Sequence, residues 1–406
     1  MISQTPLPTL ASAALELRAN VGDRFFRAEA DRLARVCHTM AGRFSRGGRL
    51  LACALQPADR SDARHVAVEF VHPVIVGKRA LSALALTGDG ASLHAQIDLL
   101  VEPNDIVMTF GDHNDLRPVI NLARERGALT LAFASLGAEA EFVPPTIESC
   151  IRQELIETLY HVLWELVHVF FEHRGLLENR PPGTVHDGGA SGFLYPFLTE
   201  AERGLDDVLA DVRASILMKA EEAMNLRRST VQDSERALTA AAEALRRAFS
   251  DGGRVLAFGN GGSATDAMDA VADLLFPPHG WSRQPALDLT EDPAILSAIG
   301  NDIGHDAVFA RQIIAYGRKA DVALAFSTSG DSRNIIAALE EARRRGLYTV
   351  AFVGYEGGRI AADRLADAVI IAPSEHIPRI QEAHATAWHL LRDRLEQMLR
   401  DRLDQR

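Results

Sequence analysis

The chain has 406 residues, of which 47% are hydrophobic and 24% charged, so it is a globular protein with room for two or three domains. Its formal net charge of −12 argues against a nucleic-acid partner, which needs a basic face, but leaves room for a local pocket that takes an anionic metabolite. We expect no membrane partner, because no stretch approaches the roughly 18 to 20 apolar residues of a membrane span.

The N-terminus and the cysteines indicate a cytoplasmic protein. The first twenty residues lack a basic region followed by an apolar run, so no signal peptide is expected. The spacing of Cys37, Cys53 and Cys150 fits neither a zinc knuckle nor a disulfide framework. We expect these residues to be small buried hydrophobes in a reducing compartment.

The first half begins with an amphipathic helical region over about residues 12–46. A glycine stop and the apolar segment GGRLLACAL (47–55) follow, and this segment is typical of a buried strand. NDIVMTFG (104–111) predicts a second strand, LRPVINLARERG a helix, and ALTLAFAS (128–135) a third strand.

The second half repeats this order. A helical region over about 203–250 leads into GGRVLAFGN (252–260), a predicted strand. Further strands are predicted in DVALAFSTSG (321–330), LYTVAFVG (347–354) and ADAVIIAPS (366–374), with the helix SRNIIAALEEARRRG after the first of these. Strands that alternate with helices indicate a parallel sheet covered on both faces.

The chain therefore contains an internal duplication. GGRLLA aligns with GGRVLA, and LRPVINLARERGALTLAF aligns with SRNIIAALEEARRRGLYTVAF. The predicted fold class is α/β: two three-layer α/β/α domains with parallel sheets, each preceded by a helical segment. The expected domains are 1–174 and 203–406, joined by a connector rich in Pro and Gly over 175–202, whose FLYPF segment (193–197) is expected to dock on a neighbouring surface.

Two turns in the second half favour phosphate binding. GNGGS (259–263) lies between a strand and a helix, where glycines let an anion approach the backbone and Asn260 and Ser263 offer side-chain hydrogen bonds. STSGDS (327–332) places four hydroxyls, from Ser327, Thr328, Ser329 and Ser332, around the next strand-to-helix turn. Helix capping is the alternative, but four hydroxyls exceed what a cap needs.

These turns, together with AIGNDIGHDAVFARQI and RIQEAHATAWH, resemble the sugar isomerase (SIS) domain, and within it the phosphoheptose isomerases, over roughly 205–406. The resemblance implies interconversion of a ketose phosphate and an aldose phosphate through an enediol, without a nucleotide cofactor. It also implies substrate contacts at Asn260, Gly261, Gly262, Asn301, Asp302, Ser327, Thr328, Ser329, Ser332 and Gln381.

The family carries a His and a Glu four residues apart, then a Gln and a His, which bind zinc and include the acid–base pair. The second half keeps Gln381 and His389 but has Asp269 and Asp273 as the earlier pair. The first half has all four residue types. They are His65, Glu69, Gln153 and His161. The resemblance thus gives two candidate zinc sets, one in each half. For His65 and Glu69 the alternative is a solvated pair on a helix surface.

The first half lacks the phosphate motifs, since CALQPADRS and TFGDHND stand in their places and the GND segment is deleted. These reciprocal losses suggest a composite site, in which one half binds the phosphate and the other supplies chemistry. Members of the family are oligomers, so the resemblance implies a homo-oligomer, a dimer of pseudo-dimers.

The leading function is therefore a phosphosugar isomerase, an intramolecular oxidoreductase that converts sedoheptulose 7-phosphate to a heptose 7-phosphate or acts on a similar sugar. Glu69 or Asp273 would be the base and His161 or His389 the partner acid. Gln381 would orient the substrate or bind metal. The alternative is a non-catalytic sugar-phosphate-binding regulatory or assembly protein, which the two aspartates favour.

Overall fold

The computed structural model describes residues 7–73, 78–172, 177 and 204–404, and it divides into two compact units. The N-terminal unit comprises Arg18–Glu222, and the C-terminal unit comprises Met1–Leu17 with Ala223–Arg406. Apart from residue 177, the connector expected at 175–202 lies outside the described residues, and so does its FLYPF segment.

The N-terminal unit contains a five-stranded sheet with the order β2-β1-β3-β4-β5, in which all pairings are parallel. Its strands are β1 Leu50–Ala54, β2 Ala83–Thr87, β3 Ile106–Phe110, β4 Leu129–Ala132 and β5 Ala140–Glu141. Its helices are α1 Leu7–Ser45 (from Arg18), α2 Pro57–Val71, α3 Gly90–Leu100, α4 Leu116–Glu125, α5 Ser149–Glu172 and the first part of α8 Leu205–Asp233.

The C-terminal unit contains a second five-stranded parallel sheet, with the order β10-β9-β8-β6-β7. Its strands are β6 Val255–Phe258, β7 Ala286–Asp288, β8 Val322–Ser327, β9 Tyr348–Gly354 and β10 Ala368–Ala372. Its helices are α9 Glu235–Ser250, α10 Gly262–Leu275, α11 Pro293–Asp302, α12 Val308–Tyr316, α13 Arg333–Arg344, α14 Gly358–Ala362 and α15 Ile377–Asp404, with a 3₁₀ turn, η2, at His305–Ala307.

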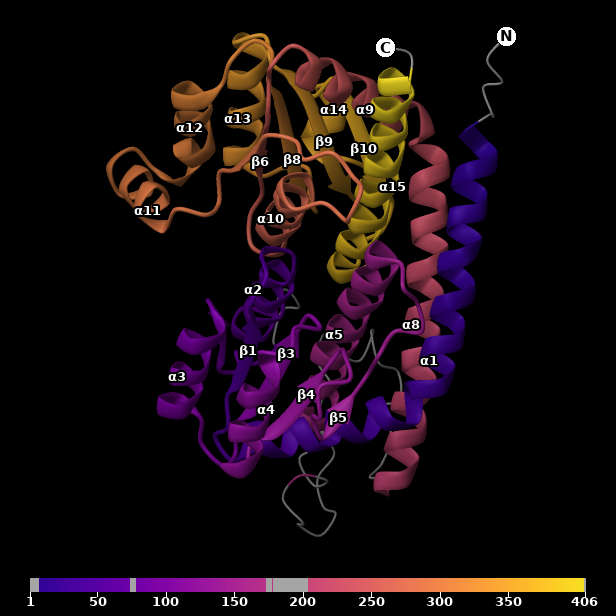
Figure 1. The fold of residues 1–406 in the computed structure, drawn as a ribbon, viewed down its shortest axis with the longest axis vertical. Helices are drawn as coiled ribbons and strands as arrows, with labels where there is room; N and C mark the ends of the chain where they lie inside the picture. Colours follow the sequence, from indigo (N-terminus) through magenta and orange to yellow (C-terminus); the bar gives the residue numbers. More distant parts are fainter. Residues whose placement is uncertain (1–6, 74–77, 173–176, 178–203, 405–406) are drawn as a thin grey trace. The chain divides into compact units, whose positions relative to one another are not determined.

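Helices cover both faces of each sheet. In the C-terminal unit, one apolar core joins the sheet to α9, α10 and α15, and another joins it to α12, α13 and α14 (Figure 1). In the N-terminal unit, one core joins the sheet to α1, α2, α5 and α8, and the other joins it to α3 and α4. The predicted fold class, two three-layer α/β/α domains with parallel sheets, is confirmed.

The two sheets have the same topology, which confirms the internal duplication at the level of the fold. In each, the first strand along the chain lies between the second and the third. The main difference follows the second strand: α11, η2 and α12 stand between β7 and β8, whereas α3 alone stands between β2 and β3. This accounts for the missing GND segment of the first half.

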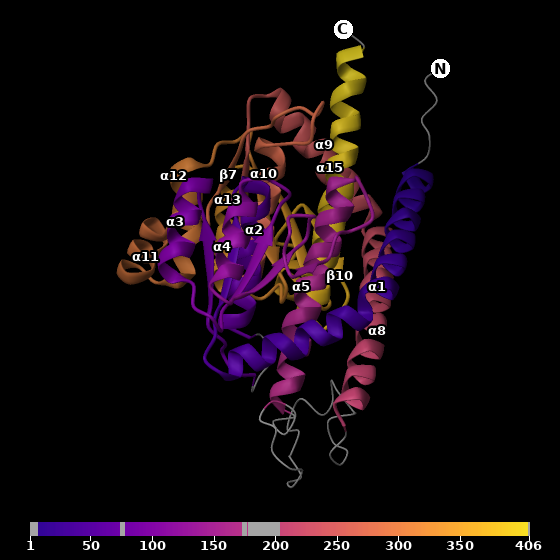
Figure 2. The same ribbon diagram turned by 60° about the horizontal axis from the view of Figure 1, so that its bottom comes forward.

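The long helices divide differently from the boundaries expected from the sequence. Val208, Val212 and Ile216 of α8 pack into the core of the N-terminal unit, and Leu15 of α1 packs into that of the C-terminal unit. The two helices run side by side in both views (Figures 1 and 2). Each α/β unit thus uses a helical segment from the other half of the sequence.

Candidate functional site

The two glycine- and serine-rich turns follow neighbouring strands of the C-terminal sheet. GNGG follows β6 and leads into α10, and STSG starts with the last residue of β8 and comes shortly before α13. Strands β6 and β8 are hydrogen-bonded neighbours. After β6 the chain continues to β7 on one side of this pair, and after β8 it continues to β9 on the other side. Open parallel sheets bind ligands at such a switch point, beyond the carboxyl ends of the strands. Both turns therefore border the crevice where this fold binds ligands.

Glycine is required in both turns. Gly261 has a φ of 56° and Gly330 a φ of 66°, a region that residues with a Cβ rarely adopt. A Cβ at Gly330 would also lie 2.2 Å from the backbone oxygen of Gly357. The turns bring the N-termini of α10 and α13 to the same edge of the sheet, and helix N-termini offer free N–H groups and a positive dipole end to an anion.

A pair of amides ties the two turns together. Asn260 Nδ2 donates to Asn334 Oδ1 at 2.9 Å, and Asn334 Nδ2 donates to Asn260 Oδ1 at 2.8 Å. Asn334 Nδ2 also lies 3.3 Å from His305 Nε2. Sequence reasoning assigned Asn260 to the substrate and missed Asn334, although it belongs to the quoted FSTSGDSRN segment. The geometry gives Asn260 a positioning role for the turn itself.

Several hydroxyls of the STSG turn are not used for capping. Ser332 is the N-cap of α13 but makes no side-chain cap hydrogen bond. Ser327 Oγ accepts from the Gly330 amide at 3.1 Å, and Ser329 Oγ accepts from the Asp331 amide at 3.2 Å. Thr328, Ser329 and Ser332 are all half-buried. The capping alternative therefore does not explain Ser332.

The remaining predicted substrate residues lie in different surroundings. Ser263 is buried in the first turn of α10, next to Gly262. Asn301 and Asp302 are exposed at the end of α11, where Asn301 Nδ2 donates to Asp302 Oδ1 at 2.8 Å. Within the described ranges no hydrogen bond links these two residues to either turn, so their substrate contacts stay a prediction.

The corresponding place in the N-terminal unit is acidic. Helix α2 begins at Pro57, which lacks an N–H, and a Cβ at Gly111 would lie 2.3 Å from Asp59 Oδ2, so the carboxylate fills the turn. Burial raises the pKa of Asp59 to about 6, although Arg152 opposes this and the charge of Asp112 adds to it. The Asp59 carboxylate would repel a phosphate here, and the hydroxyl cluster of the STSGDS turn has no counterpart in TFGDHND, in agreement with the predicted loss of the phosphate motifs.

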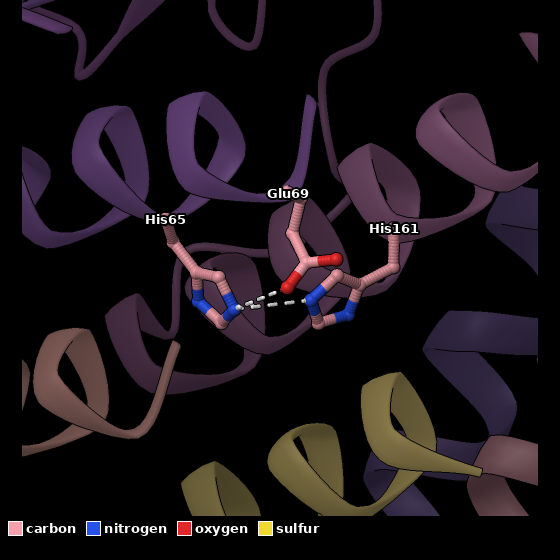
Figure 3. A group of neighbouring side chains, drawn as sticks. All are labelled: His65, Glu69 and His161. Atoms are coloured by element: carbon pink, nitrogen blue, oxygen red, sulfur yellow. Dashed lines mark hydrogen bonds and ion pairs between the residues drawn. The ribbon is translucent and has the colours of Figure 1, made fainter. Parts of the chain in front are cut away.

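The N-terminal unit instead brings His65, Glu69 and His161 together. His65 and Glu69 project from α2, and His161 projects toward them from α5 (Figure 3). His65 Nε2 lies 3.3 Å from His161 Nε2 and 3.9 Å from Glu69 Oε1. All three side chains are at most 3% exposed. The alternative of a solvated surface pair for His65 and Glu69 is therefore wrong.

Two neighbours act on this cluster, one by contact and one by charge, and sequence reasoning missed both. The Tyr160 hydroxyl lies 3.0 Å from His65 Nδ1, which leaves Nε2 of that ring facing His161 and Glu69. Glu165 is buried and forms an ion pair with Lys219 of α8. Burial, together with the charge of Glu165, raises the pKa of Glu69 to about 8. Glu69 Oε2 is buried and has no hydrogen-bond partner in the part of the chain that the structure describes.

The geometry of this cluster suits a divalent metal ion. One ligand atom from each of the three residues lies within 4.8 Å of the others. A tetrahedral zinc ion with bonds of about 2.0 to 2.2 Å separates its ligands by about 3.3 to 3.6 Å. The two imidazole nitrogens already have that separation. Gln153, the predicted fourth ligand, is half-buried two turns before His161 on α5.

The C-terminal unit brings Asp269, Asp273 and His389 together, with ligand atoms within 4.8 Å of one another. His389 Nε2 lies 3.7 Å from Asp273 Oδ2. Gln381, on the same face of α15, is 2% exposed, and its Oε1 has no hydrogen-bond partner among the described residues. The structure thus brings Asp269, Asp273 and His389 together, while their roles and that of Gln381 stay a prediction.

Asp273 has two further partners that the sequence motifs did not indicate. Trp388 Nε1 donates to Oδ2 at 3.0 Å, and Arg392 Nη1 lies 3.0 Å from Oδ1. The available signal was the spacing on α15, since Arg392 follows Gln381 by eleven residues and so lies on the same helical face.

Comparisons with known proteins agree with this architecture. Residues 220–354 match the model of the SIS domain family. The phosphoheptose isomerase of Thermodesulfovibrio yellowstonii is 35% identical over 193 residues, which are 47% of this chain and 94% of that protein. The phosphoheptose isomerase of Pelodictyon phaeoclathratiforme is 41% identical over 178 residues, 43% of this chain and 83% of that protein.

Solved structures with the same fold cover both units. The C-terminal domain of glucosamine-fructose-6-phosphate aminotransferase from Francisella tularensis matches 94% of this chain and 93% of its own, with a TM-score of 0.58 at 10% identity. The tagatose-6-phosphate ketose/aldose isomerase of Escherichia coli matches 94% of this chain and 92% of its own, with a TM-score of 0.53 at 12% identity. At these identities the likeness concerns the fold alone.

Among the described residues, no helix is both long and apolar enough to cross a membrane. Because it covers nearly all of a phosphoheptose isomerase at 35% identity, the chain belongs to the family of SIS-domain proteins that includes the phosphoheptose isomerases.

Proposed function

We propose that the chain is an aldose–ketose isomerase that acts on a sugar phosphate, most specifically on sedoheptulose 7-phosphate, which it converts to a heptose 7-phosphate. The observation that carries this proposal is the pair of turns after β6 and β8, which place two helix N-termini and uncommitted hydroxyls at one edge of the sheet. The names of the matched relatives supply the class of substrate.

The terminal phosphate is assigned to the STSG turn. The α13 N-terminus and the hydroxyls of Thr328, Ser329 and Ser332 would donate to its oxygens. Asp269 lies seven residues beyond Gly262 on α10, about 10 Å along the helix axis from the GNGG turn that neighbours the STSG turn. The sugar carbonyl would then approach the cluster on α10 and α15.

The reaction moves one proton between neighbouring carbons. A base removes the proton from the carbon next to the carbonyl, which gives an enediol, and the proton returns to the former carbonyl carbon while another moves between the two oxygens. The proposal has two candidate bases, Glu69 in the N-terminal unit and Asp273 in the C-terminal unit. A buried carboxyl with a pKa near 8, such as Glu69, can both take and give a proton near neutral pH.

The proposal includes zinc in the N-terminal unit, held by His65, Glu69 and His161, with Gln153 as the fourth candidate. The fit rests on the ligand separations and on Glu69 Oε2, which is buried without a hydrogen-bond partner in the described part of the chain. When bound, zinc supplies a positive charge that stabilises negative oxygen atoms. Independently of the metal, Tyr160 holds the His65 ring in orientation through Nδ1.

A second candidate function is a non-catalytic sugar-phosphate sensor. The observation that favours it is the engagement of Asp273, whose two carboxylate oxygens contact Arg392 and Trp388. A carboxylate held in this way is less free to remove a proton. Such a sensor would bind the sugar phosphate at the same turns but would not convert it.

Binding and turnover measured on one preparation separate the two functions. Calorimetry with sedoheptulose 7-phosphate should give a dissociation constant in the micromolar to millimolar range, and chromatography should show an aldose heptose phosphate accumulating to equilibrium. Binding without product supports the sensor. Absence of binding contradicts both, and sedoheptulose without phosphate is the matched control. The proposal keeps the cytoplasm as its location, consistent with a chain of few cysteines.

A further inference from the structure

Arg392 places a fixed positive charge inside the cluster of the C-terminal unit. Its side chain is 3% exposed and lies on α15, one turn after His389. Nη1 is 3.0 Å from Asp273 Oδ1, and the guanidinium carbon lies 4.7 Å from the centre of the Trp281 ring. A guanidinium keeps its charge when buried, so this positive charge is permanent.

This charge competes with a metal ion for the same ligand. One oxygen of Asp273 faces Arg392 and the other accepts from Trp388 Nε1, so a metal ion would have to displace a buried partner. It would also bring two positive charges close together where little water screens their repulsion. Three candidate ligands, Asp269, Asp273 and His389, are therefore present, but the carboxylate of Asp273 is already paired with a buried cation.

In the N-terminal unit the carboxylate of Glu69 has different surroundings. In the described ranges Glu69 pairs with His65 but with no arginine or lysine, and its Oε2 is buried without a hydrogen-bond partner there. The buried lysine of this unit, Lys219, forms its ion pair with Glu165 instead. Glu69 of α2 and Asp273 of α10 occupy corresponding helical positions. The carboxylate of Asp273 is bound by an arginine, whereas that of Glu69 is not.

Arg392 also has donors that the protein does not use. Although Nη1 is close to Asp273, neither Nη1 nor Nη2 has a hydrogen-bond acceptor among the described residues, and Gln381 Oε1 has no donor there. Buried donors without acceptors are costly and rare in native proteins. An oxygen-rich ligand in this cluster would satisfy them.

We propose that Arg392 replaces the metal ion in the C-terminal unit: its guanidinium holds Asp273 and donates to an oxygen of the bound sugar phosphate, so that this unit works without a metal. The identity of the ligand rests on the proposed function, whereas the exclusion of metal by Arg392 does not. Arg392 thereby acts as the fixed cation of the cluster.

Metal counting tests the replacement without any substrate. The chelator-treated protein is dialysed against Co²⁺, and bound cobalt is measured by elemental analysis and visible absorption. Asp273→Asn and His389→Ala should leave the cobalt content of the wild type unchanged, whereas His161→Ala should lower it by one ion per chain. A loss of cobalt in either Asp273→Asn or His389→Ala overturns the proposal.

Arg392→Leu gives the complementary result. Removal of the guanidinium frees Asp273, so this variant should bind one more cobalt ion than the wild type, while Arg392→Lys, which keeps the charge, should not. An Arg392→Leu protein with the circular dichroism of the wild type and no added ion contradicts the replacement. If this variant does not fold, the cobalt contents of Asp273→Asn and Arg392→Lys still test the proposal.

Ligand binding in the presence of chelator completes the test. Arg392→Lys should weaken sedoheptulose 7-phosphate binding about tenfold, because lysine lacks the forked donors of arginine. The control is Arg400→Lys, since Arg400 pairs with Glu396 on the same helix and is half-exposed. Unchanged affinity in Arg392→Lys overturns the ligand contact. If the wild type does not bind the sugar phosphate, the proposed function fails, while the cobalt counts still judge the metal replacement.

Discussion

At the scale of single residues, the hydroxyls of the STSG turn should carry the phosphate. Ser329→Ala combined with Ser332→Ala should weaken sedoheptulose 7-phosphate binding by about 1 to 3 kcal/mol, the usual value of hydrogen bonds to a charged group. Ser332 makes no cap hydrogen bond, so the loss should come from the ligand and not from the stability of α13.

The matched control for this pair is Ser229→Ala with Ser250→Ala. Both of these hydroxyls donate to a backbone carbonyl of their own helix, α8 or α9, away from the turns. Calorimetry should show wild-type affinity for the control. Equal affinities in the wild type and the Ser329/Ser332 double variant would place the phosphate elsewhere.

The second prediction at this scale concerns which carboxylate acts as the base, Glu69 or Asp273. Glu69→Gln should lower turnover by about 100- to 10,000-fold, the range for loss of a general base, and should leave sugar-phosphate affinity nearly unchanged if the N-terminal unit supplies the chemistry. Asp273→Asn should have this effect if the C-terminal unit is self-sufficient. Steady-state kinetics of the two variants separate these models.

Asp273→Asn should also change the stability of the protein. Asp273→Asn removes the carboxylate that pairs with the buried Arg392, and such a change destabilises a protein by about 3 to 5 kcal/mol. Urea unfolding must therefore accompany the kinetics. Full activity in Glu69→Gln, together with an inactive but folded Asp273→Asn, would show that the N-terminal unit contributes no base.

At the scale of elements, the contact between α15 and the sheet should make the C-terminal unit sensitive to acid. His384 of α15 is fully buried against the rings of Phe326 and Phe352, and burial lowers its pKa from 6.5 to about 4. His384 thus binds a proton below about pH 6.5 in the unfolded chain, but only below about pH 4 in the folded unit. Stability is complete above the unfolded pKa and is lost as the pH falls through this window.

The expected loss is about 2 to 3 kcal/mol between about pH 7 and pH 4.5, since one pKa unit corresponds to about 1.4 kcal/mol. His384→Leu should flatten this dependence, whereas His279→Leu, at an exposed position, should not. Urea titrations at several pH values measure it. The same slope in the wild type and His384→Leu would show that another group is responsible.

The strands show how far the sequence predicts the elements. The strands predicted from apolar runs correspond to β1, β3, β4, β6, β8, β9 and β10, of which the central ones are buried at every position. The strands that were missed are β2, β5 and β7, each at the edge of its sheet. β5 and β7 have only two and three residues, too few for a distinct apolar run. β2, ALALT, is as long and as apolar as a central strand, and it differs from them in being partly exposed.

The site was predictable where its residues lie in local motifs. The turns of residues 259–263 and 327–332 and the helical pairs on α2 and α10 are visible as short patterns. Arg392, Asn334 and Tyr160 were not found, because their roles depend on partners more than 70 residues away in sequence. The packing of α15 on α10, the pairing of β6 with β8, and the packing of α5 on α2 bring these partners together.

At the scale of the whole molecule, we predict that the chain self-associates. The long helices carry exposed apolar side chains, including Met218, 50% exposed on α8, and Leu17, 47% exposed on α1. Sedimentation at micromolar concentrations should give a dimer or larger species, and Met218→Glu should shift it toward the monomer. Only monomer across this range in the wild type would contradict the prediction.

The central claim is that the chain moves a proton between neighbouring carbons of a sugar phosphate. Incubation of the purified protein with sedoheptulose 7-phosphate in D₂O, followed by ¹H NMR, tests it most directly, because an enediol exchanges its transferred proton with solvent when the base is accessible. We expect a new aldose anomeric signal and loss of the proton signals at the first two carbons, both absent in the Ser329/Ser332 double variant at low substrate concentration. A spectrum with no aldose and no deuterium incorporation, from protein that binds the sugar phosphate, would contradict the account.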